Sequence, residues 1–295
     1  MDLTPTTIRQ LQTGFSRQFN VGLNRAETKL EQIATRIVSS TRITTYGWMA
    51  KLLKMRKWDG PRIIQNLNAY AYALENDLYE LTVGVDVRDI RDDQLGVYST
   101  LFEELGMTAK RWPSQLLKTV LQGGTVNNGF DSVPFFGSTH SLNSFGNQAN
   151  NFTTTPLNSA NFATVRSAMA AFTGEDGEPL GVEGNLLVVP PQLADTANTI
   201  VTATFGSSGA TNIQAGQAKV LVVPELANQG TTWYLFDDSN AIKGLVWQIR
   251  KPPELVAKTK PSDDNVFFDH QLIWGSDAEG AAGYGPWFLS ARAIA

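Results

Sequence analysis

Hydrophobic and polar residues alternate most regularly between residues 77 and 90, in "DLYELTVGVDVRDI". Leu81 and the valines at every second position after it share one face, and polar or small residues take the other, as in a strand with one solvated face. A suitable partner lies within residues 42–54, so the pattern predicts a long antiparallel hairpin with its tip near "KWDGPR". Such a ribbon is marginally stable alone and needs a neighbouring surface.

Helical spacing dominates on both sides of this hairpin. Apolar residues at steps of three and four predict two short amphipathic helices within residues 1–40, joined at "NVGLN". After the hairpin, Asp92 or Asp93 is a good N-cap for a long helix, and Pro113 is expected to begin a second one.

The second half of the chain mixes helices with buried strands. A helix is predicted over residues 158–173, and "NLLVVPP" predicts a buried strand that leads into another helix. Further strands are predicted at "AKVLVVPEL", "TWYLFDD" and "GLVWQIRK". Because no βαβ unit repeats, the predicted fold class is α+β.

Composition is that of a folded globular protein. The 295 residues are 42% hydrophobic and 18% charged, with no cysteine, which excludes disulfides and thiolate chemistry. No apolar run approaches the ~20 residues that span a bilayer, and the N-terminal residues do not read as a signal peptide. A cytoplasmic location is therefore expected.

Charge is divided unevenly along the chain. Residues 1–62 contain eleven Lys and Arg against four Asp and Glu, whereas the other 233 residues contain thirteen basic and twenty-four acidic groups. A basic front and an acidic body are complementary to a second copy of the same chain. Composition leaves two alternatives open. The basic segment could fold back on its own body, or it could bind nucleic acid.

One segment, "TYGWMAKLLKMRKWDGPR" at residues 45–62, contains two tryptophans and five basic residues. A core strand would not carry this many cations, because an unpaired buried charge costs several kcal/mol. The segment is therefore expected to meet a surface outside its own core. Packing of Trp48 and Trp58 at the base of the ribbon within the same subunit is the alternative.

Residues for catalysis are sparse. The two histidines, His140 and His270, lack the spacing of a metal site, and each is expected to be a partly buried, hydrogen-bonded side chain. Asp269 and His270 adjoin in an expected strand, where neighbours point to opposite faces. No nucleophile elbow, phosphate-binding loop or dinucleotide fingerprint occurs. We therefore predict no enzyme activity, catalytic residue, metal or cofactor.

The run from residue 39 to residue 98 resembles the Mu-like major head subunit family of tailed bacteriophages and prophages. The ordered motifs "STR-x-x-T-YGW", "W-x-G-x-R" and "DD-x-LG-x-Y" carry the resemblance, with support from "FDSVPFFGSTHSL" and "GAAGYGPWF". It implies a Hong Kong 97-type capsid fold and a major capsid protein that assembles into pentamers and hexamers of an icosahedral shell around double-stranded DNA. A head-associated ring protein of adaptor or portal type is the alternative.

The resemblance also implies a division of the chain. Its parts would be an N-terminal arm (1–40), an extended loop (41–90), a peripheral domain (91–127 and 241–295, with a spine helix at 92–112) and an axial domain (128–240). In that fold the arm and the loop reach across neighbouring subunits.

We expect the extended loop of one subunit to meet an acidic spine on the next. The tryptophans and methionines would supply burial, and the charges would set orientation. The loop residues are Trp48, Met49, Lys51, Lys54, Met55, Arg56, Lys57, Trp58 and Arg62, and the spine residues are Asp92, Asp93, Glu103 and Glu104.

Other expected partners are a separate scaffolding protein, a portal, a possible decoration protein and, by weak nonspecific contact, packaged DNA. No membrane partner is expected. The protein would belong to the virion after assembly in the bacterial host cytoplasm.

Overall fold

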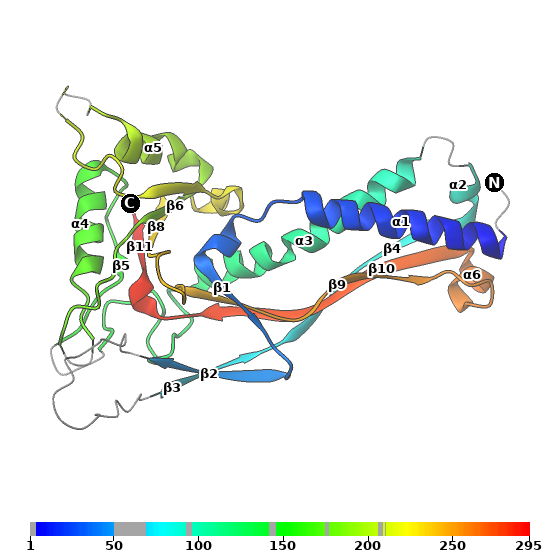
Figure 1. Ribbon diagram of the computed structural model, residues 1–295, viewed down its shortest axis with the longest axis horizontal. Coiled ribbons are helices and arrows are strands. Elements are labelled where there is room, and N and C mark those ends of the chain that lie inside the picture. Colours follow the sequence, from blue (N-terminus) through cyan, green and yellow to red (C-terminus); the bar gives the residue numbers. More distant parts are fainter. Residues whose placement is uncertain are drawn as a thin grey trace, which may run out of the picture.

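The computed structural model describes residues 4–49, 69–92, 96–141, 146–174, 177–205, 209 and 211–295. Its elongated body is a four-stranded sheet with two long helices, α1 (Pro5–Arg25) and α3 (Val97–Gly123), side by side over one face (Figure 1). The strands lie in the order β1 (Ala34–Val38), β9 (Leu245–Lys258), β10 (Gln271–Tyr284) and β4 (Asp77–Asp86).

β9 and β10 set the length of this body. Each has 14 residues, which corresponds to roughly 46 Å at ~3.3 Å per residue. β9 extends beyond the predicted strand because Pro252 and Pro253 fall at a register shift and past the end of β1, where a missing N–H removes no ladder bond. α6 (Asp264–Asp269) lies between β9 and β10, and α2 (Val87–Asp92) follows β4.

A second, five-stranded sheet forms the other end of the molecule. Its order is β5 (Asn151–Phe152), β11 (Ser290–Ile294), β8 (Thr232–Phe236), β6 (Leu186–Val189) and β7 (Lys219–Val222). Two helices accompany it, α4 (Ser159–Ala170) and α5 (Ala194–Thr202). Short 3-10 turns are η1 (Leu30–Ile33), η2 (Pro191–Leu193), η3 (Pro224–Gln229) and η4 (Trp287–Leu289).

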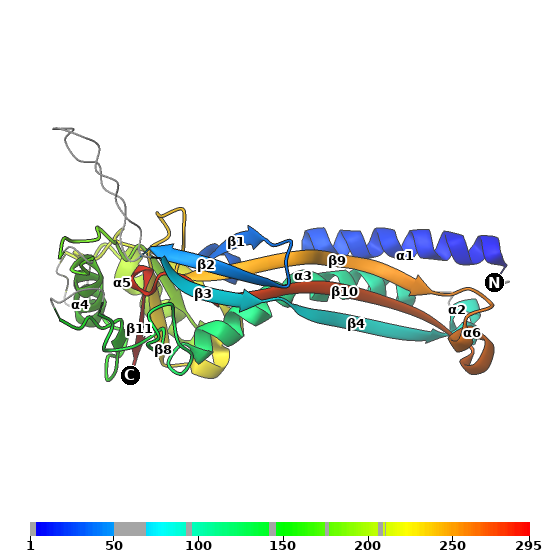
Figure 2. The same cartoon turned by 90° about the horizontal axis from the view of Figure 1, so that it is seen from below.

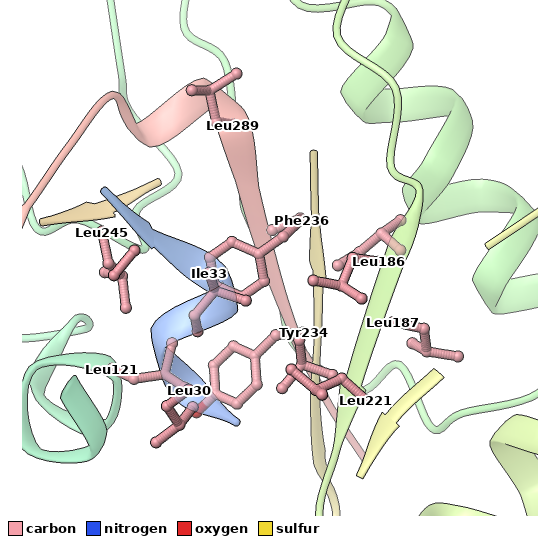
Figure 3. Packing of buried hydrophobic residues seen from close by; sticks show 14 of the residues in the cluster. Leu30, Ile33, Leu121, Leu186, Leu187, Leu221, Tyr234, Phe236, Leu245 and Leu289 are labelled. Atoms are coloured by element: carbon pink, nitrogen blue, oxygen red, sulfur yellow. The ribbon is translucent and has the colours of Figure 1, made fainter. Parts of the chain in front are cut away.

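A common core joins the two sheets. Leu30 and Ile33 of η1, Leu121 of α3 and Tyr234 of β8 are all buried in it (Figure 3). Because these residues come from distant parts of the chain, burying them fixes the second sheet relative to the long body.

The first helix packs on its own chain. Phe15 stacks on Phe102 with ring centroids 4.0 Å apart, and both rings meet the edge or face of Trp274 at 5.2 Å. These aromatics form a second buried cluster between α1, α3 and the sheet. The resemblance implies an arm that reaches across neighbouring subunits, but α1 docks on a surface of its own subunit.

The prediction of two short helices in the arm was wrong. A single helix runs to Arg25 through "NVGLN", and Ile37 lies in strand β1 rather than in a helix. Gly22, which suggested a break, lies where α1 approaches α3: a Cβ there would be 2.0 Å from the carbonyl oxygen of Glu103. Gly106 has the reciprocal role, since its Cβ would be 2.1 Å from the carbonyl oxygen of Phe19.

The spine-helix boundaries at 92–112 were also wrong. Gly96 has a left-handed φ of 67° and is the N-cap of α3, which begins at Val97. The helix then continues through Pro113 to Gly123, because Trp112, Pro113 and Leu117 are all buried. That burial offsets the cost of a proline inside a helix, about 3 kcal/mol for the missing hydrogen bond and the crowding of its ring together.

Strand pairing differs from the predicted hairpin. β4 shows the expected alternation, with Val85 buried, but it pairs along its whole length with β10. The hairpin instead consists of β2 (Ile43–Met49) and β3 (Ala69–Glu75). The predicted tip near "KWDGPR" lies outside the described residues.

The expected strand through His270 was wrong as well. Asp269 ends α6, and His270 is in the left-handed region at φ 53° before β10 begins. His270 is the C-cap of α6, and its left-handed backbone ends the helix before β10.

We predict that Gly22→Ala and Gly106→Ala each lower the free energy of unfolding by about 1–3 kcal/mol, because the added methyl overpacks the contact between α1 and α3. Urea denaturation measures the change. Gly14→Ala is the matched control: it lies in the same helix with nothing within 4 Å and is expected to stabilise by about 0.5–1 kcal/mol. Equal stability of the Gly22 and Gly14 variants would contradict the close contact.

Candidate inter-subunit contact surface

The β2–β3 hairpin crosses the face of the long sheet that α1 and α3 leave open (Figure 2). Tyr46 and Tyr72 are opposite each other in its register, and both reach the sheet. The Tyr46 hydroxyl donates to Oε1 of Gln248, and the Tyr72 hydroxyl accepts from the backbone N–H of Tyr284 at 3.2 Å. The described base of the hairpin is therefore fixed to its own subunit.

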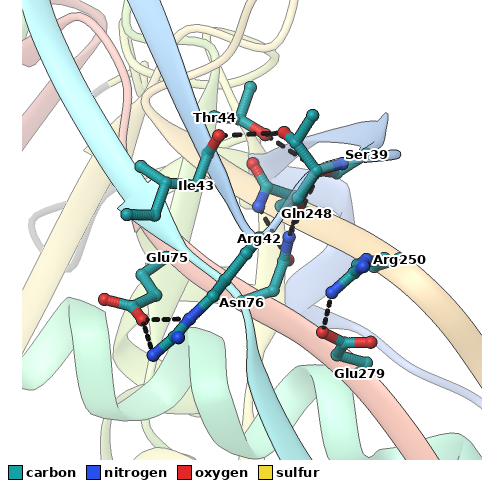
Figure 4. Close-up of polar contacts among 10 residues, drawn as sticks. Ser39, Arg42, Ile43, Thr44, Glu75, Asn76, Gln248, Arg250 and Glu279 are labelled. Carbon is teal, nitrogen blue, oxygen red and sulfur yellow. Dashed lines mark hydrogen bonds and ion pairs between the residues drawn. The ribbon is translucent and has the colours of Figure 1, made fainter.

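A buried polar network holds the point where β3 turns into β4 (Figure 4). Asn76 is 5% exposed, and its Oδ1 accepts from Nε2 of Gln248 at 2.7 Å. Its Nδ2 donates to the carbonyl oxygen of Thr41 at 2.8 Å and to Oγ of Ser39 at 3.2 Å. Its backbone N–H bonds to the carbonyl oxygen of Arg42 at 2.8 Å, so one side chain ties both ends of the hairpin to β9.

Burial raises the pKa of the tyrosines around this base. It raises the pKa of Tyr46 and of Tyr72, although the bond from Tyr284 N–H opposes the shift at Tyr72. Burial likewise raises the pKa of Tyr284 to about 12. An ordinary tyrosine is already protonated at neutral pH, and these upward shifts extend the protonated range of all three hydroxyls to higher pH.

An ion pair flanks the network at the solvent side. Arg42 bonds through Nε and Nη2 to one oxygen of Glu75, at 2.8 and 2.7 Å. Both side chains are largely exposed, so the pair orients the two strands more than it stabilises them.

The predicted loop contacts begin where this base ends. Trp48 and Met49 are the last residues of β2, and their side chains lie outside the described part of the structure. The remaining predicted loop residues also lie outside it, namely Lys51, Lys54, Met55, Arg56, Lys57, Trp58 and Arg62. Their contact with a neighbouring subunit stays a prediction.

The predicted acidic spine is dispersed. Glu103 pairs with Arg25 of α1 at 2.6 Å, and Glu104 lies 3.8 Å from Arg111 on its own helix. Asp92 is exposed but ends α2 instead of lying on α3, and Asp93 is outside the described residues. A neighbouring loop would thus have to compete with existing partners for both glutamates.

Sequence reasoning did not single out Asn76 or Gln248. A signal was present, because Gln248 is the one polar residue in the apolar run "LVWQI" and Asn76 interrupts two strands. A polar side chain inside a buried strand needs a partner, but the sequence does not say which one.

The histidines have structural surroundings. His140 is fully buried, with Nδ1 2.6 Å from Oδ2 of Asp131 and Nε2 3.2 Å from Oδ1 of Asn150, and its ring stacks on Trp287. Both histidines were expected to be partly buried and hydrogen-bonded. His140 is hydrogen-bonded and fully buried, whereas the expectation of burial is wrong for His270, which is exposed. Within the described residues no cluster of three or more potential metal-binding side chains occurs, and no helix is long and apolar enough to span a membrane.

A family model described as the Mu-like prophage major head subunit gpT matches residues 8–156, 147–226 and 225–294. The chain belongs to this family. The major capsid protein of Escherichia phage Mu is 29% identical over 290 residues, which cover 98% of this chain and 74% of that protein. The Mu-like prophage FluMu major head subunit of Haemophilus influenzae is 25% identical, covering 98% and 73%.

Solved capsids share the fold of this Mu-like head subunit. The procapsid of bacteriophage JBD30 has a TM-score of 0.64 at 27% identity, over 99% of this chain and 76% of that one. The capsid of cyanophage P-SCSP1u has a TM-score of 0.62 at 10% identity, over 92% and 88%, which shows the fold alone.

The predicted α+β fold of Hong Kong 97 type and the family resemblance are thus confirmed. The protein is the major capsid protein of a tailed phage, a structural component of the virion and not an enzyme.

We predict that Gln248→Leu and Asn76→Ala each cost about 1–3 kcal/mol of unfolding free energy, because each leaves buried polar groups without partners. Since the two side chains share one bond, the double variant should lose less than the sum, with a coupling of about 0.5–3 kcal/mol. Urea denaturation of the four proteins measures this.

Gln12→Leu, on the exposed surface of α1, is the control for this cycle and should change stability by no more than about 0.5 kcal/mol. Strictly additive losses in the cycle would show that the Asn76–Gln248 bond does not hold the hairpin base.

Proposed function

We propose that copies of this chain form the pentamers and hexamers of a closed icosahedral shell that encloses the double-stranded DNA of a phage head. The observation that carries this proposal is similarity along nearly the whole chain to the JBD30 procapsid, an assembled shell. A ring protein of adaptor or portal type has no comparable support.

The proposed division into domains follows the fold. The peripheral domain would be the body built on α3, β9 and β10, and the axial domain would be the five-stranded sheet with α4 and α5. The extended loop would be the β2–β3 hairpin with the segment between its strands. The arm at residues 1–40 would stay with its own subunit through α1.

Contacts between copies are proposed at the loop segment that leaves the fixed hairpin base. Because Tyr46, Asn76 and Gln248 hold that base, the segment from Trp48 to Arg62 would reach a neighbour from a defined direction. Its tryptophans would each bury on the order of 150–250 Å², whereas each exposed ion pair would contribute about 0–1 kcal/mol.

Two exposed aromatic side chains at the α6 end of the body give independent support for self-association. Phe267 and Phe268 of α6 are 70% and 73% exposed and contact each other edge to face. Together they offer on the order of 300–500 Å², less than the roughly 800 Å² per partner of a stable dimer interface. Such a patch suits a weak contact that forms only when several interfaces form at the same time in a shell.

Scaffolding protein, portal, decoration protein and assembly in the host cytoplasm complete the proposal. The JBD30 capsid, one of the solved structures with this fold, is decorated with minor capsid protein trimers. A comparable decoration protein would bind the assembled shell of this chain.

Trp48→Ala combined with Trp58→Ala should leave a folded subunit that fails to form shells, because the loop loses its largest apolar side chains. Electron microscopy of purified protein measures shell formation, and circular dichroism reports folding. Trp48→Phe with Trp58→Phe is the matched control and should retain shells. Normal shells from the alanine variant would remove both tryptophans from the interface.

Phe267→Ser combined with Phe268→Ser should reduce the yield of closed shells at least several-fold while leaving the unfolding midpoint unchanged. The exposed rings contribute to contacts between copies but little to the core. Shell yield is counted by electron microscopy at fixed protein concentration. An unchanged yield would show that this end of the body contacts no other copy.

A further inference from the structure

A buried polar cluster lies where the two sheets meet. His140 and Asn150 belong to the chain that joins α3 to β5, and both are fully buried. Trp287 belongs to η4, which connects β10 of the long sheet to β11 of the second sheet. Its indole stacks on the His140 ring, with centroids 4.2 Å apart and planes at 12°. Because the ring is shielded from bulk water, its polar atoms depend on partners within the protein.

Hydrogen bonds to the backbone fix the orientation of the Asn150 amide. Its Oδ1 accepts from the backbone N–H of Gly137 at 2.9 Å. Its Nδ2 lies 2.8 to 3.2 Å from three backbone carbonyl oxygens, those of Phe135, Trp287 and Ser290. A carbonyl oxygen only accepts and a backbone N–H only donates, so rotating the amide by 180° would lose all of these bonds. Oδ1 is therefore the atom that faces His140.

Both ring nitrogens of His140 face hydrogen-bond acceptors. Nε2 lies 3.2 Å from Oδ1 of Asn150, and Nδ1 lies 2.6 Å from Oδ2 of Asp131. A neutral imidazole carries one N–H, so one of its nitrogens would point a lone pair at an acceptor oxygen. Only a state with a hydrogen at both positions makes both bonds. The proton between Nδ1 and Oδ2 can lie on either atom, but in both cases Nε2 must carry a second one.

The surroundings of the ring favour this second proton. Asp131 is the charged side chain that faces the ring, and it is itself 5% exposed. With the second proton the Asp131–His140 pair is neutral overall, whereas without it the pair is a buried, uncompensated negative charge. The indole of Trp287 adds a π-face, which attracts a cation within ~6 Å. Gly137 and Asn150, on the Nε2 side, carry no charge that would oppose it.

We propose that Asp131 and His140 together hold one more proton in the folded protein than in the unfolded chain at about pH 7–8, and that this proton makes the junction of the two sheets sensitive to pH. In an unfolded chain a histidine gives up its proton at about pH 6.5 and an aspartic acid at about pH 3.9. Above about pH 6.5 the folded state is then the one that binds more protons, so raising the pH weakens it. The stabilisation is complete at lower pH and is lost as the folded pair releases its proton.

The effect of the lost proton is local. Without it, Nε2 no longer donates to Asn150, whose amide ties the chain between α3 and β5 to Trp287 and Ser290. Opening at high pH is therefore expected first at this junction. The proposal goes beyond shell formation, because it concerns one folded subunit and holds whether or not copies assemble.

NMR of the histidine ring nitrogens in the full-length chain tests the protonation directly. The chain has two histidines and His270 is exposed, so a His270→Gln variant leaves the signals of His140 alone. At about pH 7.5, where a free histidine is mostly neutral, both nitrogens should show the chemical shift of a nitrogen that carries or shares a hydrogen. A free lone pair at either nitrogen would overturn the inference.

Urea denaturation over about pH 7–8 measures the linked proton. In the unmodified chain and in His270→Gln, the folding equilibrium constant should fall by up to about tenfold more per pH unit than in His140→Gln, because one proton is released. Asp131→Asn keeps the shape of the side chain but removes its charge, and should flatten the dependence as His140→Gln does. Equal pH dependence in all four proteins would refute the proposal. Should His140→Gln fail to fold, the ring nitrogens of the His270→Gln protein still decide.

Discussion

The hydrogen bond between Gln248 and Asn76 determines where the hairpin leaves the body. It lies in a buried setting, where an unmade bond costs more than a made bond gains, so the hairpin base has one arrangement that satisfies every partner. Tyr46 and Tyr72 add contacts on either side of it. These bonds fix where β2 begins and β3 ends on the long sheet.

The long sheet separates two surfaces of different composition. On one face, α1 and α3 bury the aromatic cluster around Phe102 and Trp274, and their outward sides carry the positive charge. On the other face, the hairpin covers part of the sheet, and paired charges occupy β9 and β10. Because strand side chains alternate between faces, one sheet supports both surfaces without conflict.

Individual elements show where sequence patterns were reliable. The alternation in β4 and the buried run of β6 were predicted because each pattern reflects burial of one segment against any apolar surface. Gly22 and Pro113 misled, because each read as a break in a helix. At Gly22 the missing side chain permits contact with Glu103, and at Pro113 burial of the neighbours offsets the missing bond. Both effects depend on residues distant in sequence.

The sequence by itself determined the fold class, the family and the presence of a cationic, aromatic segment at residues 45–62, because motif order, composition and hydrophobic period are local properties of the chain. Only the tertiary structure decided that β4 pairs with β10, that α1 packs on its own α3, and that Glu103 and Glu104 already have partners. Pairing and charge neutralisation depend on which distant groups meet, and that is fixed when the whole core is buried at once.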